Sequence, residues 1–364
     1  MNVGIIGCGR IADAHAEEIC RTAGNRIVGV CDREELMAKQ LCERFEAQAY
    51  YDDVDQLLEE GRPQVVHITT PPQSHFSLAA RCLEEGCHVY VEKPLTVTAD
   101  EAETLISLAS SKQLLLTVGH DDQYSLVARD MRKLVAAGYL GGPPIHMESH
   151  YGYDLGDQVY VRSLLGDKRH WIRSLPGTLM QNNISHGISR IAEYMPGENP
   201  NVTVQGFVSP LLQSMGETDI VDEVRVIISD NTTGTTAYFT FSTQMRPMMR
   251  QFRLYGKTNG LFLDHHHQTL IKIKGHKYKS YLEQFLPHYG FAKQYLAGSA
   301  KNVVRFLRRD LHMKAGLRYL IDSFYQAITT HGDPPIPYRE IVLTARIMVS
   351  IFSQLPASGR IDAC

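Results

Sequence analysis

Up to about residue 120, short apolar runs alternate with longer segments whose apolar residues recur at helical spacing. Short apolar runs that end at Gly, Pro or Asp predict buried strands, and the longer segments predict amphipathic helices. The predicted strands cover residues 1–6, 26–31, 64–68, 87–91 and 114–118, and the predicted helices include 33–45, 73–85 and 98–111. Thr98 and Glu101 have the spacing of a helix-capping box. Strands separated by helices need parallel crossovers, so this region predicts an α/β fold with a doubly wound parallel sheet.

The pattern changes after about residue 121. A helix is predicted at 123–138, and a loop-rich stretch covers 152–176. Segments of alternating polarity predict the strands of a second, larger sheet at 145–151, 202–208, 222–229, 235–243, 251–255 and 260–264. Asp230–Gly234 has the composition of a hairpin loop, and amphipathic helices are predicted at 316–329 and 338–354. We therefore predict two domains, 1–121 and 122–364, and the C-terminal helices could pack back on the first domain.

The composition is that of a globular protein. Its 364 residues are enough for two domains, and a formal net charge of -3 argues against general nucleic-acid binding. No apolar run approaches the roughly 20 residues that span a bilayer. The first residues predict a strand, without the basic flank and cleavage pattern of a signal peptide. The seven cysteines lack Cys-x-x-Cys spacing, which predicts reduced thiols in a cytoplasmic protein.

Small residues follow the first predicted strand at the positions that a dinucleotide-binding turn requires. Gly7 permits the tight turn, Gly9 lets the backbone approach a pyrophosphate, and Ala12 permits close packing of helix on strand. Arg10 and Ile11 lie in the same turn at the helix N-terminus, whose free N–H groups attract phosphates. The alternative is a glycine turn in an α/β domain that binds no nucleotide.

Asp32 ends the second predicted strand, about 20 residues after Ala12, where dinucleotide-binding domains carry a ribose-binding acid. A carboxylate accepts hydrogen bonds from both ribose hydroxyls of NAD and repels the 2′-phosphate of NADP. The neighbouring Arg33 could instead stack on adenine or pair with that phosphate. We therefore expect NAD as the cofactor, with NADP as the less favoured alternative.

Glu92, Lys93 and Pro94 directly follow the strand at 87–91. The carboxyl ends of strands in an open α/β sheet form the ligand crevice. An ammonium group there can orient a substrate hydroxyl and stabilise the charge that develops when it is oxidised. An ordinary solvated loop is the alternative. One shared crevice is expected for the residues at strand ends, which are Gly7, Asp32, Thr70, Lys93 and Gly119.

In the order and spacing of these motifs, the chain resembles the family of glucose–fructose oxidoreductase, inositol dehydrogenase and the rhizopine-catabolism protein MocA. The glycine fingerprint with Asp32, the segment from Thr69 to His75, and Glu92-Lys93-Pro94 carry the resemblance. It covers the first domain throughout and the second more loosely. It implies a nucleotide-binding Rossmann domain followed by an α+β domain with a large, mostly antiparallel sheet. The other face of that sheet often forms a subunit interface in this family, so a homodimer or homotetramer is expected.

The resemblance also implies roles for single residues. Lys93 would face the nicotinamide, and Thr70, Pro72, His75 and Glu92 would contact or frame the cofactor. Gly119 and Asp121 are also assigned to the cofactor, although Asp121 stands where family members often have a neutral asparagine.

A second motif ends at His186. Family members usually carry a glycine-rich turn here, then a helix with an aspartate and, four residues later, a histidine, so that both lie on one helix face. His186 matches the histidine, but Asn182 replaces the aspartate, Ile184 a glycine and Ser189 an acid. Asparagine cannot take a proton near neutral pH. His186 is therefore the expected base, with Lys93 of lowered pKa as the alternative.

The expected reaction is hydride transfer from a carbinol carbon to the nicotinamide. His186 would take the hydroxyl proton, Lys93 would hold the oxygen, and Asn182 would orient the substrate. Trp171, the only tryptophan, is expected in the pocket wall rather than the core, and Arg173 and Tyr151 are further expected substrate contacts.

No metal site is expected. Three consecutive histidines, His265–His267, could suggest one, but adjacent strand residues point to opposite faces and cannot all converge. A polar edge is the simpler interpretation.

Residues 272–318 form a basic stretch in which eleven cations face two acids. The cations are Lys272, Lys274, Lys277, Lys279, Lys293, Lys301, Arg305, Arg308, Arg309, Lys314 and Arg318, and the acids are Glu283 and Asp310. Apolar residues recur beside them at near-helical spacing. One interpretation is a solvated helix that packs on the sheet through its apolar stripe. The other is an anionic partner: a nucleotide sugar, a polyprenyl-phosphate sugar, or a membrane surface contacted through residues 291–311.

Three functions are compatible with the sequence. The leading hypothesis is an NAD-dependent oxidoreductase of a small carbohydrate-type substrate: a sugar, a polyol or a sugar nucleotide, neutral or anionic. The second is a non-redox enzyme that uses tightly bound NAD for transient oxidation during glycoside cleavage or epimerisation. The third is an NAD-binding sensor or assembly protein without turnover. Asn182 gives the second and third some weight, and retention of NAD during dialysis would distinguish the second from the first.

Overall fold

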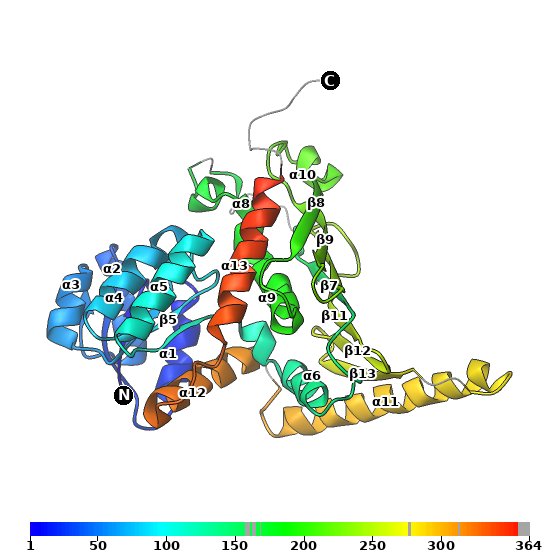
Figure 1. The fold of residues 1–364 in the computed structure, drawn as a ribbon. Helices are drawn as coiled ribbons and strands as arrows, with labels where there is room; N and C mark the ends of the chain where they lie inside the picture. Colours follow the sequence, from blue (N-terminus) through cyan, green and yellow to red (C-terminus); the bar gives the residue numbers. More distant parts are fainter. Residues whose placement is uncertain (157–160, 162–164, 168, 276–277, 312–313, 356–364) are drawn as a thin grey trace. The chain divides into compact units, whose positions relative to one another are not determined.

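The computed structural model describes residues 1–156, 161, 165–167, 169–275, 278–311 and 314–355 (Figure 1). The chain divides into two compact units. Unit 1 comprises residues 1–120 and 317–345, and unit 2 comprises residues 121–316 and the segment from 346 onward.

Unit 1 contains a six-stranded, entirely parallel sheet in the order β3-β2-β1-β4-β5-β6. The strands are β1 (Asn2–Ile6), β2 (Arg26–Cys31), β3 (Tyr50–Tyr51), β4 (Val65–Ile68), β5 (His88–Val91) and β6 (Leu116–Val118). This is the strand order of a dinucleotide-binding Rossmann fold, so the predicted doubly wound sheet is confirmed. Only the short edge strand β3 was absent from the prediction. The central strands are buried on both faces, and parallel sheets of this kind bind their ligands at the carboxyl ends of the strands.

The helices of unit 1 follow the predicted pattern. They include α1 (Ala12–Arg21), α2 (Glu35–Phe45), α3 (Val54–Gln56), α4 (His75–Glu84) and α5 (Ala99–Ser111), with the short turns η1 (Leu57–Gly61) and η2 (Pro72–Ser74). The capping box on α5 is confirmed, because Thr98 Oγ1 accepts from the N–H of Glu101 and the Glu101 carboxylate accepts from the N–H of Thr98. Residues 317–330 of α12 (Ala315–Thr330) also belong to unit 1.

Unit 2 contains a seven-stranded sheet in the order β13-β12-β11-β7-β10-β9-β8. Its strands are β7 (His146–Gly152), β8 (Asn201–Phe207), β9 (Glu223–Asp230), β10 (Thr235–Ser242), β11 (Arg250–Tyr255), β12 (Asn259–Asp264) and β13 (Thr269–Lys274). Every neighbouring pair is antiparallel except β7 and β10, so the predicted large, mostly antiparallel sheet is confirmed. The hairpin loop between β9 and β10 also forms as predicted. Strand β13 falls in the basic stretch, where no strand was predicted.

The helical segments of unit 2 are η3 (Asp121–Tyr124), α6 (Leu126–Ala136), η4 (Trp171–Ser174), α8 (Thr178–Asn183), α9 (Ser185–Tyr194), α10 (Pro210–Ser214) and α11 (Leu282–Leu307). Helix α9 lies close against β7 and β10. A Cβ on Gly187 would come within 2.4 Å of the Phe239 ring, and Ser149 Oγ donates to the Gly187 carbonyl at 3.0 Å. This close approach sets the position of the first turn of α9, where His186 lies.

Candidate functional site

The glycine turn of unit 1 has the backbone conformation that was predicted. Gly7 has a φ of +94°, and a Cβ there would lie 2.7 Å from Thr70 Cγ2 and 2.9 Å from the Thr69 carbonyl carbon. Only glycine therefore fits at this position. A Cβ on Gly9 would meet nothing within 4 Å, so the backbone of this turn borders open space. Arg10 and Ile11 are exposed beside it.

The Asp32 carboxylate is fixed at the carboxyl end of β2. Its Oδ2 accepts from the N–H of Cys8 at 2.6 Å, and its Oδ1 accepts from the N–H of Glu34 at 3.0 Å. The side chain is partly exposed, and the neighbouring Arg33 is exposed. An oriented acid next to an open glycine turn fits a ribose and the adjoining pyrophosphate.

His75 connects two of the loops at the carboxyl edge of the parallel sheet. Its Nδ1 lies 2.8 Å from the Pro94 carbonyl oxygen, and its Nε2 lies 2.8 Å from the Thr70 carbonyl oxygen. Burial lowers the pKa of His75, although its hydrogen bonds oppose this. Pro72, also buried, lies between these residues in η2. His75 and Pro72 therefore hold the loops after β4 and β5 in place, which is the framing part of their predicted role.

A buried chain of hydrogen bonds leads to Glu92. Tyr325 Oη lies 2.8 Å from His67 Nε2, His67 Nδ1 lies 2.8 Å from His15 Nδ1, and His15 Nε2 lies 2.9 Å from Glu92 Oε1. Burial raises the pKa of Tyr325 and lowers that of His67, so the phenol keeps its proton and the His67 ring is neutral. The neutral His67 ring shares one proton with His15 between their Nδ1 atoms, and His15 Nε2 donates to the Glu92 carboxylate. These hydrogen bonds were not predicted, because the residues that form them come from distant segments of the sequence.

Glu92 is an internal anion rather than an exposed contact. Burial alone would raise the pKa of Glu92, but the hydrogen bond and field of His15, together with the charge of Lys93, lower it to about 2. Its Oε2 accepts from the backbone N–H of Lys93 at 3.1 Å. A Cβ on Gly119 would lie 3.1 Å from Glu92 Oε1, so this glycine makes room for the carboxylate. The chain thus fixes the backbone that carries the partly buried Lys93.

In unit 2, the motif around His186 departs from the predicted single helix. Helix α8 ends at Asn183 and α9 begins at Ser185, and Ile184 between them accepts from the N–H of Gly187 as in a tight turn. Asn182 lies on the first helix and His186 on the second. Ile184 nevertheless has helical backbone angles, and its carbonyl also accepts from the N–H of Ile188. The expectation that Asn182 and His186 share one helix face therefore stays a prediction.

His186 instead has two carboxylates beside it, from Asp121 and Asp122. Its Nδ1 lies 3.6 Å from Asp121 Oδ1 and 4.0 Å from Asp122 Oδ2. Asp122 Oδ1 in turn lies 3.2 Å from His265 Nε2. Asp121 was predicted as a cofactor contact, and Asp122 was not predicted at all.

The three consecutive histidines also need a correction. They lie in the turn between β12 and β13, not on a strand, and His265 is largely buried beside Asp122. The interpretation as a polar edge is wrong for His265. It describes His267, whose side chain is 72% exposed and lies 3.1 Å from Asp264.

The field around Asp122 keeps this carboxyl group ionised. Burial would raise the pKa of Asp122, but His265, His186, Arg190 and Arg250 together hold it well below its usual range. Burial lowers the pKa of His265, and Asp122 partly offsets this. The result is a buried anion next to the imidazole of His186.

Tyr151 closes one side of the same cluster. Its ring stacks on His186 with centroids 5.8 Å apart, and the guanidinium of Arg250 lies 4.9 Å from the Tyr151 ring centroid. Burial raises the pKa of Tyr151, so the phenol stays protonated. A cavity of about 10 Å³ lies among Tyr151, His186, Asp122 and His265. This volume is close to that of one water molecule and far below that of a sugar.

Asp121, Asp122 and His186 could in principle hold a metal ion, since one ligand atom from each lies within 4.8 Å of the others. Two carboxylates and an imidazole are ligands that Mg²⁺ or Mn²⁺ accepts. Here, however, Arg190 and Arg250 already face Asp122 and would repel a cation. The described residues therefore fit a network of ion pairs better than a metal centre.

The remaining predicted substrate residues lie in and beside η4. Trp171 is partly exposed, with its ring 5.3 Å from that of His170. Arg173 donates to Glu217 Oε1 at 2.7 Å and to the Leu165 carbonyl at 2.5 Å. Since a carboxylate already matches the charge of Arg173, this residue is poorly suited to bind an anionic substrate. The role of Trp171 stays a prediction.

Comparison with known proteins gives a consistent result for unit 1. Residues 1–120 match the Gfo/Idh/MocA family model, described as "Oxidoreductase family, NAD-binding Rossmann fold". D-glucoside 3-dehydrogenase of Escherichia coli (strain K12) is 31% identical over 142 residues, which are 39% of this chain and 40% of that protein. UDP-N-acetylglucosamine 3-dehydrogenase of Acidithiobacillus ferrooxidans is 31% identical over 149 residues, 41% and 44% of the two chains. The chain thus spans about two fifths of the length of these curated relatives.

Solved structures resemble the whole chain in fold. The structure of that Acidithiobacillus enzyme covers 97% of this chain and 98% of its own, with a TM-score of 0.69 and 21% identity. The WlbA dehydrogenase of Bordetella pertussis, in complex with NADH and UDP-GlcNAcA, covers 97% and 94% with a TM-score of 0.76 and 14% identity. At such identities the similarity establishes the fold of both units.

Proposed function

We propose that this chain, whose residues 1–120 match the Gfo/Idh/MocA family model of NAD-binding oxidoreductases, oxidises or reduces a carbohydrate-type substrate. The reaction is hydride transfer between a hydroxyl-bearing carbon and a nicotinamide cofactor. A sugar, a polyol or a sugar nucleotide is the expected substrate. The names of the relatives, a glucoside 3-dehydrogenase and a UDP-N-acetylglucosamine 3-dehydrogenase, support this class.

The pairing of His186 with Asp121 and Asp122 is the observation that carries the proposal. A histidine base is stabilised in its protonated form by a nearby carboxylate. Asn182 cannot supply that carboxylate, but Asp122 is buried, ionised and 4.0 Å from the ring. The carboxylate missing from the second motif is thus provided by η3.

The proposed mechanism divides the chemistry between Lys93 and His186. His186 accepts the hydroxyl proton of the substrate, and the anionic carboxylates beside it stabilise the imidazolium that forms. Lys93, whose backbone is fixed by Glu92, donates a hydrogen bond to the substrate oxygen as the carbonyl develops. Bound NAD supplies the acceptor for the hydride. In the reverse direction His186 returns its proton to the oxygen.

Gly7, Gly9 and Asp32 are proposed to hold the cofactor, through the backbone N–H groups of the turn and the carboxylate at the end of β2. The open space at Gly9 and the two backbone bonds to Asp32 fit a pyrophosphate and a ribose. The fixed carboxylate favours NAD over NADP, because it would repel a 2′-phosphate.

The test is a spectrophotometric assay for NADH with a panel of glycosides, inositols and UDP-sugars. His186→Asn and Lys93→Met are each expected to lower kcat by about 10²–10⁴-fold, since each removes a proton-transfer or hydrogen-bonding group of the transition state. His267→Asn is the matched control, because His267 is exposed and outside the cluster. Wild-type turnover by the His186 variant would refute the assignment.

A different result would support a different function. NAD that stays bound through dialysis, with product formed but no net NADH, would indicate transient oxidation in glycoside cleavage or epimerisation. Cofactor binding without turnover of any member of the panel would favour a binding protein.

A further inference from the structure

Helix α11 in unit 2 presents its apolar residues outward. Its less exposed side consists of small and polar residues at helical spacing, namely Pro287, Gly290, Gln294, Gly298, Asn302 and Arg305. Large apolar side chains on its other side are exposed, among them Phe285 (65%), Leu296 (73%) and Leu307 (75%). None of its residues is buried. A surface helix of a globular domain ordinarily has the opposite orientation.

Hydrogen bonds attach the inner side of α11 to the rest of unit 2. Gln294 pairs with the backbone of Lys272 on β13 through both its amide oxygen and its amide nitrogen, at 2.8 and 3.1 Å. Asn302 donates to the carbonyls of His267 and Gln268 at 3.1 and 3.3 Å. The helix is thus fixed to the β12–β13 turn without using its apolar stripe.

A second attachment lies on α6. Lys301 and Arg305 both reach Asp130 Oδ2, at 2.5 and 3.1 Å. These contacts set the rotation of α11 about its axis, so the outward direction of the apolar residues is determined rather than incidental.

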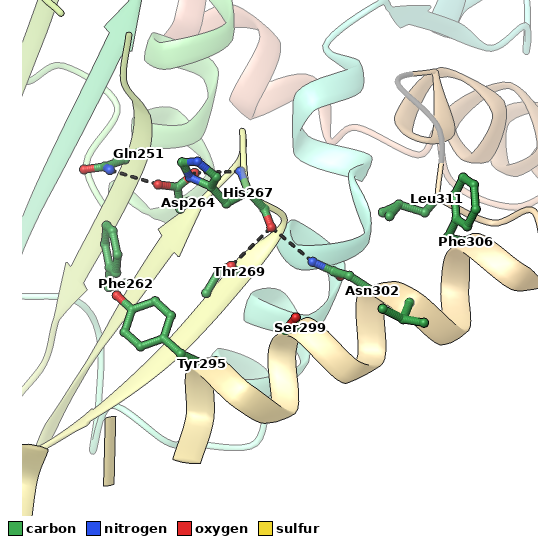
Figure 2. A pocket seen from close by; sticks show the side chains of 11 residues that line it. Gln251, Phe262, Asp264, His267, Thr269, Tyr295, Ser299, Asn302, Phe306 and Leu311 are labelled. Atoms are coloured by element: carbon green, nitrogen blue, oxygen red, sulfur yellow. Dashed lines mark hydrogen bonds and ion pairs between the residues drawn. The ribbon is translucent and has the colours of Figure 1, made fainter. Parts of the chain in front are cut away.

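The helix also stands away from the sheet along part of its length. A cavity of about 720 Å³ lies between α11 and the β11–β13 region, lined by Phe262, Asp264 and Tyr295 among others (Figure 2). In Figure 2 the Asn302 side chain crosses this gap toward the His267 backbone. Of the two interpretations of this stretch, packing of the apolar stripe on the sheet does not describe Leu296 and Leu307, which are exposed.

The charge around the exposed stripe is strongly positive. Eleven cations and two acids give residues 272–318 a formal charge of +9, whereas the whole chain carries -3. Of these cations, Lys301 and Arg305 are paired with Asp130, and Arg318 belongs to unit 1. Lys279, Lys293, Arg308, Arg309 and Lys314 are exposed near or on the helix.

From these observations we propose that α11 binds the surface of a membrane that contains acidic lipids. An amphipathic helix with aromatic and aliphatic residues on one side and flanking Lys and Arg is suited to lie in the headgroup region of a bilayer. Tyr281 and Tyr289 add exposed amphipathic rings that favour this region. No helix among the described residues has the length and apolar content needed to cross a membrane. The contact is therefore peripheral, and it is independent of the proposed redox activity.

Vesicle co-sedimentation of the full chain tests the proposal. We expect binding to phosphatidylcholine vesicles that contain phosphatidylglycerol, weak binding to phosphatidylcholine alone, and loss of binding as salt is raised. The triple variant Phe285→Ser, Leu296→Ser, Leu307→Ser should bind about a hundredfold more weakly or worse. The variant Lys293→Ala, Arg308→Ala should lose about thirtyfold, because each cation near an acidic surface contributes about fivefold.

The control variant is Leu36→Ser, Ile145→Ser, Val349→Ser, which removes three exposed apolar side chains from other surfaces and should bind like the wild type. All substituted residues are exposed, and unchanged circular dichroism checks that each variant folds. Absence of wild-type binding to acidic vesicles at low salt would overturn the proposal. An equal loss of vesicle binding in the control variant would also overturn it. So would a wild-type protein that does not bind vesicles but forms a dimer in analytical ultracentrifugation, if the Leu296 substitution abolishes that dimer.

Discussion

Replacing Glu92 by glutamine tests the buried chain of hydrogen bonds that supports Lys93. The substitution keeps the shape of the side chain and removes its charge. In the folded protein the pKa of Glu92 is about 2, against an ordinary value of 4.5. Because the folded pKa is the lower one, the ionised carboxylate stabilises the fold above pH 4.5, and this stabilisation is lost as pH falls toward 2. The difference corresponds to about 3 kcal/mol at neutral pH.

The pH dependence distinguishes the loss of the Glu92 charge from a loss of packing. Glu92→Gln should be less stable than the wild type by about 3 kcal/mol at neutral pH, and about 2 kcal/mol of that difference should disappear by about pH 3. Urea unfolding followed by circular dichroism at both pH values measures the difference. Hydrogen exchange of the β5 segment assigns the transition to unit 1.

Glu59→Gln is the matched control, since Glu59 is an exposed glutamate of the same unit. Its stability should differ from that of the wild type by less than about 0.5 kcal/mol at both pH values. A difference for Glu92→Gln that stays the same from neutral pH to about pH 3 would refute the reasoning, because it would show that charge is not the cause.

Three further predictions concern the carboxylate beside His186, the proposed ribose-binding acid and the glycine turn. Asp122→Asn removes the anion beside His186 and should lower kcat about 10–100-fold with little change in KM, measured by steady-state kinetics, whereas the more exposed Asp121→Asn should have a smaller effect. Asp32→Ala should raise the KM for NAD about tenfold and reduce the ratio of kcat/KM for NAD to kcat/KM for NADP. If that ratio is unchanged, Asp32 does not bind the ribose. Gly7→Ala should destabilise unit 1 by about 2–4 kcal/mol, because the new Cβ would lie 2.7 Å from Thr70 Cγ2; Gly24→Ala, with a φ of +85° but nothing within 4 Å, should cost only about 1 kcal/mol in the same thermal unfolding assay.

Local motifs were enough to predict the fold of unit 1. The turn at Gly7, the acid at Asp32 and the loop at Lys93 each follow a short strand, and parallel packing places all strand ends along one edge. Their positions therefore depend on neighbouring residues and on a common topology. No comparable rule predicts where the carboxylates and histidines of unit 2 lie. Asp122 in η3 and His265 in the turn after β12 are brought together by the tertiary packing of unit 2, and neither lies in a recognisable motif.

Two other differences arise because a spacing does not determine the tertiary surroundings. The spacing from Asn182 to His186 gave no sign of the two carboxylates beside His186, which come from η3. The apolar residues of α11 have helical periodicity, which predicts a helix but not which side faces the protein. Gln294 and Asn302 decide that orientation, and their partners lie on another element.

The single tryptophan can serve as a fluorescence donor to bound NADH. Trp171 belongs to unit 2, whereas the proposed cofactor residues Gly7 and Asp32 belong to unit 1. Emission from Trp171 overlaps the absorbance of NADH, so energy transfer between them reports the separation of the two units in solution. A titration with NADH would then report the distance from Trp171 to the bound cofactor without any label attached to the chain.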